Sequence, residues 1–109
     1  MSTISTDAEK QYRLGVSYHS NEQYSEAIEA KKKAVEQEPE NAKYQFSLGL
    51  SYHANGQYAE AVEVEKKAVE LEPNNAGYQY SLGVSYHENG QYEEAIAAKE
   101  KAVEQESEN

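Results

Sequence analysis

Histidine recurs at one fixed interval in this 109-residue chain, at His19, His53 and His87. Imidazole binds transition metals and exchanges protons near neutral pH, so this series is the first candidate for chemistry. If each histidine sits on its own helical unit, neighbouring ones should be a helix-packing distance apart, roughly 10 Å. A single ion with bonds near ~2 Å cannot bridge that distance, and no second ligand follows at i+4. We therefore predict no metal site, and histidines that modulate binding around pH 6 to 7.

Catalytic chemistry has little support in the sequence. The chain contains no cysteine and no glycine-rich phosphate loop. Ser17, Tyr18 and His19 are adjacent, and consecutive residues of a helix point to different faces, so they do not form a nucleophilic site. We predict a non-enzymatic protein without a cofactor.

The histidines belong to a longer repeat. The segment beginning Tyr44-Gln-Phe-Ser-Leu-Gly recurs 34 residues later as Tyr78-Gln-Tyr-Ser-Leu-Gly, and a less similar copy precedes both. After a leader at residues 1–7, three units of equal length make a single domain, at residues 8–41, 42–75 and 76–109. Boundaries in register at both ends fit an engineered or excised array as well as a natural small protein.

Each unit reads as two helices joined by a short turn. In the second unit Asn41 is a candidate N-cap, and apolar residues spaced by four predict a helix over 42–54. The Asn55-Gly56 pair breaks the chain, a second helix runs from about 58 to 72, and Pro73 ends the unit. Thr6 and Glu9 form a candidate capping box for the first helix. No strand pattern is present, so the fold class is all-α.

This pattern resembles the tetratricopeptide repeat, a 34-residue helix-turn-helix family. Its signature Leu-Gly-x-x-Tyr is matched by Leu14, Gly15, Tyr18, by Leu48, Gly49, Tyr52, and by Leu82, Gly83, Tyr86. Its later small residues are matched by Ala27, Ala34, Ala61, Ala68, Ala95 and Ala102, and its terminal proline by Pro39 and Pro73. The resemblance implies a right-handed superhelical α-solenoid of three hairpins with a protein-binding role.

The chain departs from this pattern in the second helix of each unit. The usual aromatic is replaced by Lys31, Glu65 and Lys99. We therefore expect smaller residues such as Ala30 and Val64 to make the packing contact. The mid-helix glycines should sit where the two helices approach closely, facing alanines.

The first helix of each unit has apolar residues on two opposed sides, and only one side can face its partner helix. By the resemblance, the other side lines the concave face of the superhelix, where the family usually holds extended peptides or partner helices. The predicted groove residues are Tyr12, Val16, His19, Phe46, Leu50, His53, Tyr80, Val84 and His87. Ordinary core is the alternative interpretation of this stripe.

Charge narrows the range of partners. Ten Lys and Arg stand against 20 Asp and Glu, a formal net charge of −10, which disfavours nucleic acid and anionic membranes. Glutamates crowd the second helices, so we expect the acidity on the outer surface, Glu65 included.

Some family members bind a C-terminal carboxylate with basic or amide side chains. The matching positions here lack them, at Tyr12, Val16, Ser47, Gly77 and Ser81. The predicted partner is an apolar or aromatic protein segment.

No segment has the apolar length of a signal peptide or a membrane helix, so a soluble cytoplasmic or other intracellular location is expected.

The two ends of the array differ. Lys10 stands where the later units have Tyr44 and Tyr78, so we expect a solubilised N-terminal end. The last helix keeps an apolar face, formed by Ile96, Ala98, Ala102 and Val103. Self-assembly into a homo-oligomer through that helix is therefore the alternative function.

Overall fold

The computed structural model describes residues 6–108, and its described residues form six helices without a strand. The helices are α1 (Asp7–Ser20), α2 (Tyr24–Gln37), α3 (Ala42–Ala54), α4 (Tyr58–Leu71), α5 (Ala76–Glu88) and α6 (Tyr92–Ser107). This confirms the all-α class and the two helices predicted in each unit. Residues 1–5 of the predicted leader, and Asn109, lie outside the described residues.

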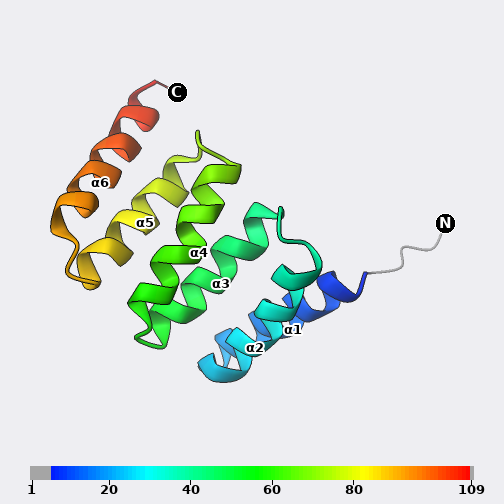
Figure 1. The fold of residues 1–109 in the computed structure, drawn as a ribbon. Coiled ribbons are helices and arrows are strands. Elements are labelled where there is room, and N and C mark those ends of the chain that lie inside the picture. The colour runs from blue at the N-terminus through cyan, green and yellow to red at the C-terminus, as the bar shows by residue number, and fades with distance from the viewer. Residues whose placement is uncertain (1–5, 109) are drawn as a thin grey trace.

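The helices pair as hairpins, α1 with α2, α3 with α4, and α5 with α6. Successive hairpins are joined by packing of α2 on α3 and of α4 on α5. Figure 1 shows the result as an elongated array with α1 and α6 at opposite ends, measuring 44 × 32 × 21 Å. Each inner helix therefore has neighbours on two sides, and each end hairpin has them on one.

Side-chain caps begin the first helix of every hairpin, and the sequence predicts those at Thr6 and Asn41. The Thr6 hydroxyl accepts from the Glu9 N–H at 3.0 Å. The Asn41 side chain accepts from the Tyr44 N–H at 3.1 Å, and Asn75 does the same one repeat later. These bonds satisfy helical N–H groups that otherwise have no partner.

The turn inside each hairpin needs one residue in the left-handed region. Gly56 and Gly90 occupy it with φ of 79° and 80°, and in the first hairpin Glu22 occupies it with φ of 61°. Only glycine adopts this conformation without a Cβ clash.

Replacing Glu22 with glycine should therefore stabilise the chain by about 0.5 to 1 kcal/mol, because a left-handed non-glycine residue is removed. Urea denaturation measures the change. The matched variant Gly56→Glu should destabilise by a similar amount. Equal midpoints for wild type and Glu22→Gly would show that the turn stores no strain at this position.

The core inside each hairpin is built from small residues. The family-type alanines of the second helices are 0–3% exposed, at Ala27, Ala34, Ala61, Ala68, Ala95 and Ala102. The helices therefore approach closely, and glycines on the first helices permit it.

What lies over those glycines differs from the prediction. A Cβ at Gly15 would meet Cγ of Lys31 at 2.5 Å, and one at Gly49 would meet Cγ of Glu65 at the same distance. A Cβ at Gly83 would meet Cγ of Lys99 at 2.7 Å. The expected contact from Val64 is present, since its Cγ2 would lie 3.3 Å from a Cβ at Gly49, whereas Ala30 is not among the nearest neighbours of Gly15; the shortest contacts come from Lys31, Glu65 and Lys99. Their methylenes fill the place of the missing aromatic ring, because a lysine or glutamate stem is apolar.

Candidate partner-binding surface

The first row of the predicted groove, formed by Tyr12, Phe46 and Tyr80, lies partly between hairpins. Tyr12 stacks on Tyr44 with ring centroids 4.9 Å apart, and Phe46 stacks on Tyr78 at 4.5 Å. Tyr80 has no such ring and is 53% exposed. Two of these three aromatics therefore help to hold successive first helices together, and each keeps only part of its ring on the surface.

The second row runs along the same helices and is more open. Val16 is 38% exposed and Leu50 is 41% exposed, while Val84 is half-buried. These residues occupy one position in α1, α3 and α5, so an aliphatic side chain meets the surface once in every repeat. Nearby, the Lys43 ammonium lies 5.0 Å from the centre of the Tyr12 ring.

The histidine row makes contacts inside its own hairpins. His19 packs edge-on against Tyr24 at 5.0 Å, and the pairs His53–Tyr58 and His87–Tyr92 repeat this at 5.1 Å. Each pair joins the end of one helix to the start of the next, so the histidines brace the turns. The repeating histidines and tyrosines are visible in the sequence, but the contact between each histidine and its tyrosine was not predicted.

The histidines differ in their polar environment. The Nδ1 atom of His19 is 2.9 Å from the Ser51 hydroxyl. Burial, and secondarily the positive charge of Lys31, lower the pKa of His19. Both effects favour the neutral form of His19. The Nε2 atom of His53 is buried and has no hydrogen-bond partner among the described residues. Within residues 6–108 no group of three or more histidine or acidic side chains is placed to hold a metal ion.

The predicted self-association residues fall into two groups. Ala98 and Ala102 are 7% and 0% exposed, so they belong to the α5–α6 core and cannot meet a partner. Ile96 and Val103 are 59% and 62% exposed. Their counterparts one repeat earlier, Val62 and Val69, are 4% exposed and half-buried.

Buried ionisable groups between the hairpins were missed by the sequence prediction. Lys31 is 3% exposed, and its ammonium donates to the Ser47 carbonyl at 3.0 Å and to the Ser51 hydroxyl at 2.8 Å. Burial lowers the pKa of Lys31 to about 8. Three features of the sequence together could have indicated this buried lysine. They are the charged residue Lys31, the glycine Gly15 that faces it, and the serines Ser47 and Ser51 on the next helix.

Glu65 takes the same position one repeat later. It is 1% exposed and accepts from the Ser81 hydroxyl at 2.6 Å, while its other oxygen is buried without a partner. Burial raises the pKa of Glu65, and the hydrogen bond from Ser81 offsets part of this rise. The prediction that Glu65 belongs to the acidic outer surface is wrong, since only its neighbours such as Glu63 and Glu70 are exposed.

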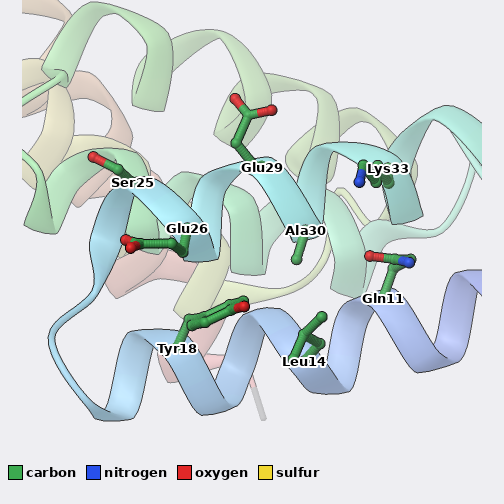
Figure 2. Close-up of a pocket in the computed structure, with 8 residues that line it drawn as sticks. All are labelled: Gln11, Leu14, Tyr18, Ser25, Glu26, Glu29, Ala30 and Lys33. Atoms are coloured by element: carbon green, nitrogen blue, oxygen red, sulfur yellow. The ribbon is translucent and has the colours of Figure 1, made fainter.

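The N-terminal end is less polar than Lys10 led us to expect. Leu14 is 45% exposed, whereas its counterparts Leu48 and Leu82 are 3% and 5% exposed. Figure 2 shows Leu14 and Tyr18 of α1 pointing toward Ala30 of α2 across an open depression. Lys10 is exposed as expected at this end, but its single charge leaves the apolar side chain of Leu14 uncovered.

None of the described helices has the length and apolar character needed to cross a membrane.

Comparison with known proteins agrees with this architecture. A family model described as anaphase-promoting complex, cyclosome, subunit 3 matches residues 20–102, more than half of the chain. No sequence among the curated proteins matches significantly.

Solved structures of similar shape share modest sequence identity with this chain. The crystal structure of MamA is 29% identical with a TM-score of 0.88, over 94% of this chain and 60% of that one. The Sgt2 TPR domain from Aspergillus fumigatus is 26% identical with a TM-score of 0.86, over 96% and 70%. The first TPR of Spaghetti (RPAP3), bound to an HSP90 peptide, is 23% identical with a TM-score of 0.87, over 98% and 85%. At that identity the last comparison concerns the fold alone.

Proposed function

Because this chain is a tetratricopeptide repeat protein and belongs to the family described as anaphase-promoting complex, cyclosome, subunit 3, we propose that it is a non-enzymatic protein-interaction scaffold. Its binding surface is the side of α1, α3 and α5 that does not pack on the second helices. Its partner is an extended peptide or a helix. The predicted groove residues supply this surface.

One observation carries the proposal. Val16 and Leu50 are large apolar side chains that stay exposed at the same repeat position, in the first helices of successive hairpins. Exposed apolar groups aligned in this way present a continuous strip to a partner, and burying such a strip drives association. The exposed part of Tyr80 extends the strip toward α6.

The chemistry of the strip favours an apolar or aromatic segment over a C-terminal carboxylate. At the positions where a carboxylate clamp would need basic or amide groups, Ser47 is buried beneath the Lys31 ammonium and Tyr12 is stacked on Tyr44. Neither can donate a charged hydrogen bond to an anion on the surface. Partners with Leu, Phe or Tyr at regular spacing would complement Val16 and Leu50 instead.

A peptide library displayed on phage and selected on the purified chain tests the proposal. Leu50→Glu should weaken binding of the selected peptides by about tenfold or more, because a charge replaces the centre of the apolar strip. Ile96→Glu, on α6 and similarly exposed, is the matched control and should leave affinity unchanged. Peptides that bind both variants as tightly as wild type would contradict the assignment.

Self-assembly remains a second candidate, favoured by a separate observation. Ile96 and Val103 of α6 are each more than half exposed, although both belong to a helix whose equivalents pack on a following hairpin. An exposed apolar helix face of this kind is typical of a subunit contact.

A further inference from the structure

The first and third hairpins each have a depression between their two helices, which we call the socket. In the third hairpin, Leu82 and Tyr86 of α5 and Ala98 of α6 line a depression together with Val69, which comes from α4 of the preceding hairpin. A valine of one hairpin thus meets the space between the two helices of the next.

The first hairpin has the same socket without an occupant among the described residues. Its lining residues Leu14, Tyr18 and Ala30 are the counterparts, two repeats earlier, of Leu82, Tyr86 and Ala98. Figure 2 shows this depression between α1 and α2. Leu14 is 45% exposed, whereas Leu82, whose depression is bordered by Val69 of the preceding hairpin, is 5% exposed.

The last hairpin carries the matching valine. Val103 is the counterpart of Val69, and it is 62% exposed on α6, where it borders an apolar depression with Ile96. Val103 therefore lies exposed on α6 and the unfilled socket lies between α1 and α2, and Figure 1 shows these helices at opposite ends of the array.

The two patches carry similar charges, with Glu26, Glu29 and Lys33 around the socket and Lys99, Glu100 and Glu104 around Val103, but one charged contact beside them is complementary. Burial, and secondarily Glu38, raise the pKa of Tyr44, and burial followed by Glu72 does the same for Tyr78. Each of these tyrosines thus lies near a glutamate, and Lys10 stands at the tyrosine position of the first repeat.

In a stack that repeats the internal geometry, Lys10 of one copy would lie beside Glu106 and the ring of Tyr80 of another. Both contacts are favourable, as an ion pair and a cation–π pair. A further contact opposes the stack. Lys99 would reach Ser17 as Lys31 reaches Ser51, and Arg13, at the place of Ser47, would bring a second positive charge close to it.

We propose that two copies of this chain associate head to tail, with Val103 of one copy seated between α1 and α2 of the other. This deepens the self-assembly candidate by naming the receiving surface, and it does not depend on peptide binding by the α1, α3 and α5 face. The contact is heterologous, so it leaves a free socket and a free valine and can extend into longer stacks. The net charge of −10 on each copy limits the affinity.

Two blocked variants of the full chain test the pairing. Leu14→Glu fills the socket with charge, and Val103→Glu removes the valine; both positions are exposed, so both variants should keep wild-type helical content by circular dichroism. In sedimentation velocity at about 0.15 M salt, where the Debye length is about 8 Å, wild type should show concentration-dependent association. Each variant alone should be monomeric.

Their equimolar mixture should form a one-to-one dimer that grows no further, because only one socket and one valine remain. A wild-type chain that stays monomeric at millimolar concentration would overturn the proposal. So would self-association of Leu14→Glu alone, which would indicate contact between two α6 helices. Either result would leave the Leu50→Glu peptide test unaffected.

Discussion

Replacing Lys31 with methionine should stabilise the protein by about 1 to 3 kcal/mol at pH 7. Methionine keeps the apolar stem that covers Gly15 and removes an ammonium that is 3% exposed. The Ser51 hydroxyl keeps His19 as a neighbour after the change. Two hydrogen bonds are lost, but a buried charge without a counter-ion costs more than they return. The free energy of unfolding in urea measures the effect.

The pH dependence gives a second readout of the same charge. The pKa of Lys31 falls from 10.5 to about 8 on folding, so the unfolded chain binds more protons between those values. Wild-type stability should therefore rise with pH through this window, by about 2 kcal/mol between pH 7 and 9.5. Lys31→Met should lack this rise.

The matched control is Lys99→Met, at the same repeat position in α6. Lys99 is only half-buried, with its ammonium 5.9 Å from the centre of the Tyr80 ring. Its replacement should change stability by less than about 0.5 kcal/mol, as at other surface positions. A Lys31→Met variant less stable than wild type at pH 7 would mean that the ammonium stabilises the α2–α3 interface.

Gly49→Leu should destabilise the chain by about 3 kcal/mol, at the upper end of overpacking effects. A Cβ at this position would meet Cγ of Glu65 at 2.5 Å and Cγ2 of Val64 at 3.3 Å. Glu65 cannot swing out of the way cheaply, because it lies between α4 and α5 and is 1% exposed. The expected consequence is loosening of both the second hairpin and its contact with the third.

Gly83→Leu serves as the comparison for this variant. Its Cβ would meet Cγ of Lys99 at 2.7 Å, but Lys99 lies at the end of the array and is half-buried. Thermal melts should therefore place Gly83→Leu between wild type and Gly49→Leu. If the two leucine variants melted together, the burial of Glu65 would have no energetic consequence.

Most of the fold could be predicted from local patterns. Apolar spacing, Asn41 as a cap and the Asn55-Gly56 break each act within a few residues, and the helices begin and end where these patterns indicate. The 34-residue period then gives three equivalent hairpins. Local signals suffice here because every contact in such an array joins near neighbours along the chain.

The packing between hairpins could not be predicted in the same way. A charged residue in an amphipathic helix is assigned to solvent by default, because burying it is costly. Lys31 is buried because Gly15 leaves room for its stem and Ser51 supplies an acceptor, and these residues lie on two other helices. The pairing of His53 with Tyr58 and the uncovered face of Leu14 are likewise properties of the assembled array.

The same reasoning changes how the partner surface should be probed. Phe46 stacks on Tyr78, so its truncation would disturb the junction between hairpins as well as any partner contact. Leu50 and Val16 are cleaner probes because they are exposed. Substitutions there report on binding with little effect on folding.

The most direct test of a partner surface on α1, α3 and α5 is an amide chemical-shift map of the isotope-labelled chain during titration with a library-selected peptide. The proposal predicts that the largest shifts follow the row Val16, Leu50 and Val84. Shifts confined to the ends of the array, around Leu14 and Val103, would contradict it and assign recognition to the stacking faces instead.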